Sequence, residues 1–293
     1  MSKNWYEICV TVGNQDAEQA SASLFEAGFA GIEERPLGDD RMTLVVFAEC
    51  SDADEIAAAR ARAAAVVGAV APDGEVAETS DALDPAVWTE NWRRHFPRLE
   101  VGQRLIVLPP WEPLPTDHRL TIVINPGLAF GTGHHETTEG CLLLIDEMVG
   151  PGVTVADVGC GSGILAIAAA KLGAAACLAT DIDPDALAAT RENAVANGVE
   201  KTVTVHATLP PAQADGTGTY NFVIANILAE TLVEIRASLE AAVALGGTLI
   251  LSGIAQSHRS LVENAFFPEG WETSRAVEAG DWVTLALHRR AVS

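Results

Sequence analysis

The chain has 293 residues, enough for two domains of ordinary size, and 48% of them are hydrophobic, so it can bury a sizeable core. It carries 18 Lys and Arg residues against 40 Asp and Glu residues, which gives a formal net charge of -22. Proteins that bind nucleic acids usually present a basic surface, so this charge argues against direct contact with a phosphate backbone. The acidity would attract a basic protein partner or serve solubility alone, and the composition leaves both open.

The five cysteines are widely spaced and form no C-x-x-C pair, so we expect neither disulfides nor a zinc site. The N-terminal residues contain no basic region followed by an apolar stretch, and no apolar run approaches the roughly 20 residues of a membrane span. These features predict a cytoplasmic protein that makes no contact with a membrane, and we expect it to be a monomer.

Residues 1–80 predict a small α+β domain with the element order β-α-β-β-α-β, which is that of a ferredoxin-like domain. The predicted strands are 6–12, 31–35, 42–49 and 75–79, and the predicted helices are 16–27 and a second one that ends at 67. Ser51 or Asp52 can cap the second helix. This stretch has 5 basic and 15 acidic residues and no catalytic constellation. We interpret it as a substrate-recognition domain; the alternative is a structural appendage.

Residues 81–100 predict a linker helix that begins at Asp84-Pro85. Trp88, Trp92 and Phe96 are spaced four apart on one face of it, so we expect this helix to be docked rather than free. Two strands, 105–108 and 120–124, are predicted next.

The loop 125–138 (NPGLAFGTGHHETT) contains three glycines, which allow a loop to hinge over a ligand. His134, His135 and Glu136 lack the four-residue spacing of a helical metal site, so no metal is expected. His135 is a possible general base, but we favour packing of the loop and capping of a helix over 137–149. Thr138, in the first turn of that helix, could face the cofactor.

The stretch 153–184 predicts a strand, a glycine turn, a helix and a second strand that ends at Asp181. The turn contains Gly159, Gly161 and Gly163, and glycine lets a ligand lie against bare backbone. Asp181 stands where a doubly wound fold often places a carboxylate against a ribose. The pattern therefore indicates a nucleoside cofactor, with an ordinary βαβ turn as the alternative.

The spacing of the glycines indicates which cofactor is bound. A dinucleotide fingerprint, G-x-G-x-x-G, would need glycine where this chain has Ile164, which argues against an NAD-dependent dehydrogenase. The sequence here is D-x-G-x-G-x-G, and Asp157 puts an acidic group where dinucleotide sites hold a pyrophosphate. A ligand with a cationic end fits better, and S-adenosylmethionine is such a ligand.

The remaining residues predict further β-α units. Asn226 follows a strand at 222–225, and ligands of open α/β sheets bind at the carboxyl ends of strands. Its amide can hydrogen-bond an amine, or it can cap a helix, and the sequence leaves both open. We expect one helix over 228–245, a strand at 248–252, a helix over 255–267 and a hairpin of 272–277 with 282–289. This order is that of a class I methyltransferase, an α/β fold.

Over essentially its whole length the chain resembles the methyltransferases that act on large-subunit ribosomal protein eleven. The glycine motif is shared by many methyltransferases, whereas the stretches 125–138 and 225–229 narrow the resemblance to this family. The stretches are NPGLAFGTGHHETT (125–138), DVGCGSGILAIA (157–168), DIDP (181–184), ANILA (225–229) and LSGI (251–254).

This resemblance implies a class I S-adenosylmethionine-dependent methyltransferase domain over 101–293 and a small ferredoxin-like domain before it. It implies transfer of methyl groups to lysine ε-amines, and to the α-amine, of the ribosomal protein. It also implies cofactor contacts at Thr138, Gly159, Asp181 and Asn226, with Ile182 packed on adenine and Asn226 orienting the amine. The chain departs from many methyltransferases in having Ala207 where an acidic residue often meets the adenine amine, so we assign no contact with that amine at this position.

Two rival hypotheses share the cofactor. A lysine methyltransferase of another protein, such as an electron-transfer flavoprotein subunit, would not need this N-terminal domain. A non-catalytic protein that binds S-adenosylmethionine as a signal would not need an intact Asn226-Ile227-Leu228-Ala229 segment.

Overall fold

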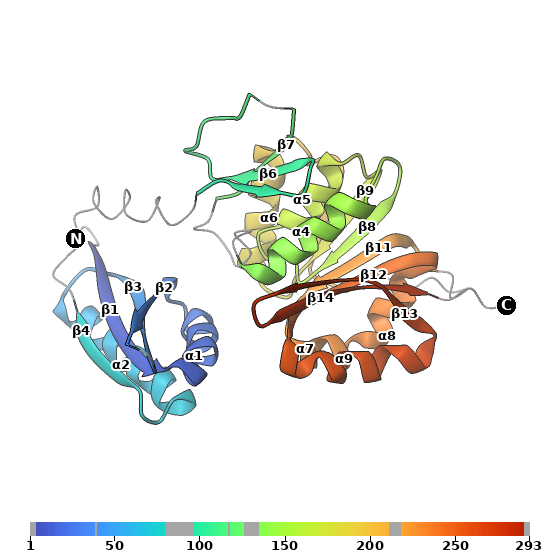
Figure 1. The fold of residues 1–293 in the computed structure, drawn as a ribbon. Coiled ribbons are helices and arrows are strands. Elements are labelled where there is room, and N and C mark those ends of the chain that lie inside the picture. The colour runs from blue at the N-terminus through green and yellow to red at the C-terminus, as the bar shows by residue number, and fades with distance from the viewer. Residues whose placement is uncertain are drawn as a thin grey trace. The chain divides into compact units, whose positions relative to one another are not determined.

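The computed structural model describes residues 4–38, 40–79, 97–116, 118–125, 135–210 and 218–289. The chain forms two compact units, Met1–His95 and Phe96–Ser293, which Figure 1 shows in different colours. Residues 81–96 of the predicted linker helix, with Trp88, Trp92 and Phe96, lie outside the described residues, as does most of the glycine-rich loop. The predicted end of this helix is wrong, because Leu99 and Glu100 belong to the strand β5 (Leu99–Val101).

The N-terminal unit has the predicted order of elements. These are β1 (Asn4–Gly13), α1 (Asn14–Glu26), β2 (Ala30–Leu37), β3 (Arg41–Cys50), α2 (Ala53–Val70) and β4 (Glu75–Thr79). The sheet order β2-β3-β1-β4, antiparallel throughout, is that of a ferredoxin-like domain. Alternate residues of β1, Ile8, Val10 and Val12, are fully buried in the core that α1 and α2 share with the sheet. Asp52 caps α2, since its Oδ1 accepts from the backbone N–H groups of Asp54 and Glu55.

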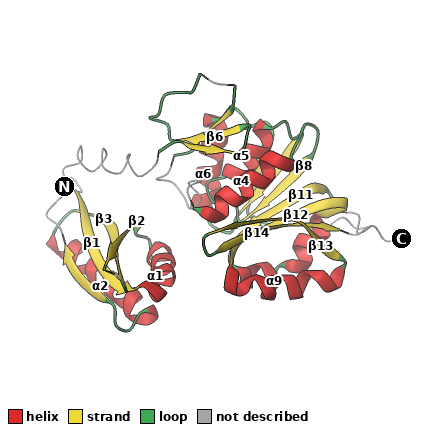
Figure 2. Ribbon diagram, in the orientation of Figure 1, coloured by secondary structure: helices red, strands yellow, loops and turns green. Residues whose placement is uncertain are grey.

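The second unit is built on a seven-stranded sheet with helices on both faces (Figures 1 and 2). Its strands are β8 (Thr154–Val158), β9 (Ala176–Thr180), β10 (Val203–His206), β11 (Tyr220–Asn226), β12 (Val243–Ala255), β13 (Trp271–Ala279) and β14 (Trp282–Arg289). They lie in the order β10-β9-β8-β11-β12-β14-β13, and only β14 runs antiparallel to the rest, between β12 and β13. This is the class I methyltransferase order.

The helices of this unit divide into two layers, each of which closes one hydrophobic core. The first layer is α4 (Glu136–Met148), α5 (Ile164–Lys171) and α6 (Pro184–Ala196); the second is α7 (Ala229–Glu234), α8 (Arg236–Ala242) and α9 (Arg259–Phe266). A small sheet of β5 (Leu99–Val101), β6 (Leu105–Leu108) and β7 (Leu120–Val123) packs into the first core. Because consecutive strands run outward from β8 in one direction and from β11 in the other, the sheet has a switch point between them. Ligands of open α/β sheets bind there.

The predicted single helix over 228–245 is wrong. Helix α7 ends at Glu234, α8 ends at Ala242, and β12 begins at Val243, five residues before the predicted strand start at 248. Ala and Leu favour a helix, but Val243 pairs with Tyr220 of β11, and Gly246 has a φ of 73° that no helix accommodates. Pairing with a distant strand overrides the local propensity. Short 3-10 turns at Gln256–His258 and Phe267–Glu269 likewise replace the ends of the helix predicted over 255–267.

Asp146 of α4 holds the small sheet to the helix. Its side chain is 6% exposed, and its carboxylate accepts from the backbone N–H groups of Gln103 and Arg104 at 2.9 and 3.2 Å. A Cβ at Gly102 would collide with this carboxylate, so the turn between β5 and β6 must lie directly against it.

Replacing Asp146 by alanine is therefore expected to destabilise the protein by about 2 kcal/mol, because the two backbone donors and the Arg104 Nε lose a charged acceptor. Urea unfolding monitored by circular dichroism measures this loss. The exposed Glu200→Ala variant is the matched control and should stay within about 0.5 kcal/mol of the parent. An Asp146→Ala variant as stable as the control would show that the contact contributes nothing.

Candidate cofactor-binding and active site

The glycine turn follows β8 at the switch point. Gly159, Gly161 and Gly163 all have positive φ, at 72°, 51° and 79°. A Cβ on Gly159 would collide with the Ile227 side chain, and one on Gly163 would meet Thr190 at 2.7 Å. The backbone N–H groups of Gly159 and Cys160 donate to the Thr180 carbonyl at 2.8 and 3.0 Å. The turn is thus hydrogen-bonded to the end of β9, and it has no room for a larger residue at Gly159 or Gly163.

Asp181 lies at the carboxyl end of β9, beside this turn. Its Oδ2 accepts from the Gly161 N–H at 2.9 Å and its Oδ1 from the Asp183 N–H at 3.0 Å. Each carboxylate oxygen can accept more than one hydrogen bond, so both retain capacity for ligand hydroxyls. The next residue, Ile182, is 95% exposed and offers an apolar surface that a flat base could cover.

Asp157 is the most strongly perturbed carboxylate of the site. It is fully buried, and its Oδ2 accepts from the Ala166 N–H of α5 at 3.1 Å. Its Oδ1 is buried with no hydrogen-bond partner in the described part of the chain. The pKa of Asp157 is raised to about 7, mainly by burial and to a smaller extent by the negative charge of Asp181, while the Ala166 hydrogen bond opposes the rise. A buried acceptor of this kind is suited to a cationic group.

Asn226, at the end of β11, and Thr138, in the first turn of α4, meet at the same edge of the sheet. The Asn226 Nδ2 donates to the Thr138 Oγ1 at 3.2 Å, and Thr138 is 1% exposed. The alternative that Asn226 caps a helix is wrong, because Leu228 is the N-cap residue of α7. Asn226 is half-buried, and its carbonyl oxygen can accept a hydrogen bond from an amine.

His135 has the capping role that we favoured from the sequence. Its Nδ1 accepts from the Thr137 N–H at 3.3 Å at the start of α4, and its ring packs edge-on against Trp282 with centroids 5.1 Å apart. His134 lies outside the described residues. Within the described ranges, no group of His, Cys, Asp and Glu could hold a metal ion, and no helix is long and apolar enough to cross a membrane.

Sequence reasoning missed the residues of α6 that hold the turn from behind. Asn193 is 3% exposed and donates through Nδ2 to the Ser162 carbonyl at 2.9 Å. The Thr190 hydroxyl donates to the Gly161 carbonyl at 2.9 Å. The available signal was the three-residue spacing of Thr190 and Asn193, which places both on one helix face.

These residues fit S-adenosylmethionine. A cradle of glycines without room for Cβ atoms, a carboxylate at the end of β9 and a buried acceptor without a partner surround the switch point. The acidic groups suit a sulfonium and an amine and would repel a pyrophosphate. Together with the strand order, they define a class I methyltransferase that depends on S-adenosylmethionine.

The chain belongs to the ribosomal protein L11 methyltransferase (PrmA) family, whose family model matches residues 4–290. It is 37% identical to the "Ribosomal protein L11 methyltransferase" of Methylococcus capsulatus over 299 residues, which cover 98% of this chain and 99% of that protein. It is 46% identical to the protein of the same name from Geobacter metallireducens, in a match that covers 68% of this chain and 64% of that protein. A crystal structure of the ribosomal protein L11 methylase from Lactobacillus delbrueckii subsp. bulgaricus superposes with a TM-score of 0.61 at 37% identity, over 66% of this chain and 99% of that one. The family resemblance and the protein methyltransferase activity predicted from the sequence are confirmed.

The affinity for S-adenosylmethionine is expected to rise with pH below neutrality. With a pKa raised from 3.8 to about 7, Asp157 is largely protonated in the free protein below pH 7, and a cationic ligand must displace that proton. The dissociation constant should fall by up to about tenfold per pH unit between about pH 5.5 and 7 and then level off. Calorimetric titration measures both the constant and the proton release. Asp157→Asn removes the titrating group, so an equally steep pH dependence in this variant would contradict the assignment.

Proposed function

We propose that this protein methylates ribosomal protein L11 in the cytoplasm, transferring methyl groups to lysine ε-amines and to the N-terminal α-amine. The similarity to known proteins supports this substrate over another protein, because relatives named ribosomal protein L11 methyltransferase match nearly the whole chain, including the N-terminal unit. The observation that carries the chemistry is the Asn226–Thr138 pair at the switch point. The protein acts as a monomer and binds neither nucleic acid nor membrane directly, in keeping with its net charge of -22.

We assign the cofactor site to the residues around the switch point. Asp157 faces the cationic end of S-adenosylmethionine, and the Gly159, Gly161 and Gly163 turn lies along its methionine part. The carboxylate of Asp181 binds the ribose hydroxyls, and the adenine packs on Ile182. Thr138 and Asn226 complete the site. The support is geometric: Gly161 bonds Asp181, Gly159 packs on Ile227, and Asn226 bonds Thr138.

The chemistry requires a neutral amine next to a methyl donor. S-adenosylmethionine supplies a methyl group on a positively charged sulfur. At pH 7 only about one lysine side chain in two thousand is neutral in water, and partial burial at the site lowers the amine pKa. Asn226 is the catalytic residue: its amide is held by Thr138 so that the carbonyl oxygen accepts an amine N–H and aims the nitrogen lone pair. Orientation of this kind can contribute several kcal/mol to a rate enhancement.

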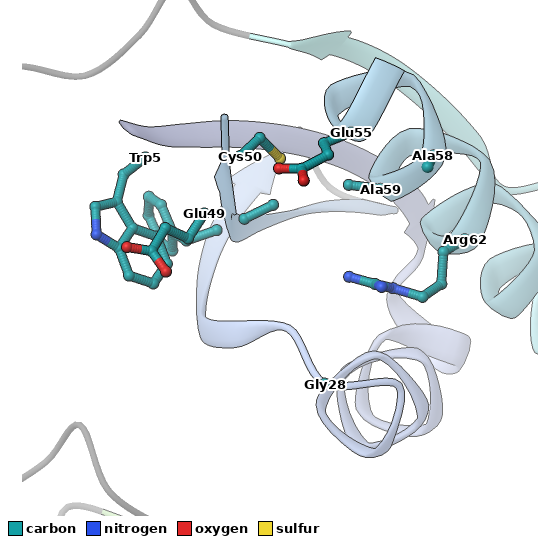
Figure 3. A pocket seen from close by; sticks show the side chains of 10 residues that line it. Trp5, Gly28, Glu49, Cys50, Glu55, Ala58, Ala59 and Arg62 are labelled. Atoms are coloured by element: carbon teal, nitrogen blue, oxygen red, sulfur yellow. The ribbon is translucent and has the colours of Figure 1, made fainter. Parts of the chain in front are cut away.

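We assign substrate recognition to a domain of residues 1–80, joined by a linker over 81–100 to the catalytic domain 101–293. A pocket of about 370 Å³ in this domain supports the assignment (Figure 3). Trp5 and Phe47 supply apolar walls, and the two carboxylates of Glu49 and Glu55 outnumber the one positive charge, that of Arg62. Such a pocket suits a basic side chain, because an aliphatic stem packs on the rings while its charged end meets a carboxylate.

Incubation with labelled S-adenosylmethionine and a mixture of ribosomal proteins should place label on L11, as identified by mass spectrometry. Asn226→Ala should lower turnover about a hundredfold while the cofactor dissociation constant changes less, because orientation is lost. Absence of label on every ribosomal protein would reject the proposed substrate. Unchanged turnover of the variant at saturating cofactor would reject the role of Asn226.

Glu49→Gln should raise the KM for L11 about threefold or more and leave kcat unchanged, because a rim charge contributes to binding rather than to the transition state. Asp73→Asn, which removes the same charge from an exposed turn of the same unit, is the matched control. Steady-state kinetics with purified L11 compares the two variants. Equal KM values for both would leave the pocket without a role in recognition.

A further inference from the structure

A buried hydroxyl behind the site connects the two elements that carry Asn226 and Thr138. Ser252 of β12 is fully buried, and its Oγ donates to the Thr137 carbonyl of α4 at 3.1 Å. Because its single proton is used there, the Thr284 hydroxyl of β14 must be the donor in the 2.6 Å contact with Ser252 Oγ. This hydroxyl is therefore bonded to Thr137 on α4 and to Thr284 on β14.

The backbone of Ser252 contacts the Asn226 side of the Asn226–Thr138 pair. Ser252 lies opposite Asn226 in the parallel register of β12 and β11, and its carbonyl accepts from the Ile227 N–H at 3.3 Å. Thr137, which accepts the side-chain bond, directly precedes Thr138. Ser252 therefore bonds the residue after Asn226 through its backbone and the residue before Thr138 through its side chain.

The approach of α4 to β14 leaves little freedom around this cluster. A Cβ at Gly140 would collide with Thr284 Oγ1, so the helix lies directly on the strand. Thr284 is 2% exposed, and Trp282, two residues before it, packs against the cap residue His135. Buried hydroxyls with all partners satisfied fix a single arrangement, because any shift leaves a polar group unpaired.

We infer that Ser252, supported by Thr284, is a positioning residue that sets the relative placement of Asn226 and Thr138 for methyl transfer. It does not touch the reacting atoms; it acts through Asn226. This inference rests on the proposed catalytic role of Asn226, so the test includes that residue.

The test is a double-mutant cycle with saturating S-adenosylmethionine and the L11 substrate. Ser252→Ala should lower kcat about tenfold with KM for L11 within about twofold, because the amide is displaced while the substrate-recognition domain is untouched. In an Asn226→Ala background the same substitution should add less than about twofold, since residues that act through one another are not additive. Thr248→Val removes a buried hydroxyl from the same strand, four residues away, and should leave kcat unchanged.

A second pair of variants keeps the inference testable where Ser252→Ala impairs folding. Thr284→Val removes the donor to Ser252 and should lower kcat, whereas Thr284→Ser keeps it and should restore activity. Additive losses in the cycle, or equal kcat values for Thr284→Val and Thr284→Ser, would overturn the inference. Full activity of Asn226→Ala alone would instead reject the proposed function, so the two failures are distinguishable.

Discussion

The parallel pairing of β8 with β9 on one side and with β11 on the other is the constraint on which the rest of the site depends. It brings three strand ends to one edge, so that Gly159, Asp181 and Asn226, far apart in the sequence, become neighbours. Ile227 then packs so closely on Gly159 that a Cβ has no room. The glycine turn, the acidic strand end and the amide are consequences of one strand order.

The buried carboxylate of Asp157 gives this edge its electrostatic character. An ionised group without full solvation is costly, so burial raises the pKa of Asp157 to about 7. A cationic ligand offsets that cost, whereas a pyrophosphate would add to it. If Asp157 binds the cofactor as proposed, this carboxylate favours S-adenosylmethionine over a dinucleotide, as the spacing of the glycines also does.

Polar side chains of α6 and β12 hold the site from behind. Thr190 and Asn193 of α6 bond the carbonyl groups of the glycine turn, and Ser252 bonds the first turn of α4. A methyl transfer that depends on orienting an amine requires such support, because a small displacement of the orienting amide is costly in rate.

The sequence by itself determined the order of elements, the cofactor class and the caps at Asp52 and His135, because periodicity, glycine spacing and capping chemistry act over a few residues. It also pointed to Asn226, since a polar residue directly after a buried strand falls at the ligand edge. Only the tertiary structure decided that residues 243–247 join a strand and that Asn193 and Ser252 are buried. Their partners, Tyr220, Ser162 and Thr137, are distant in the chain, and no local pattern specifies a contact that the assembled sheet creates.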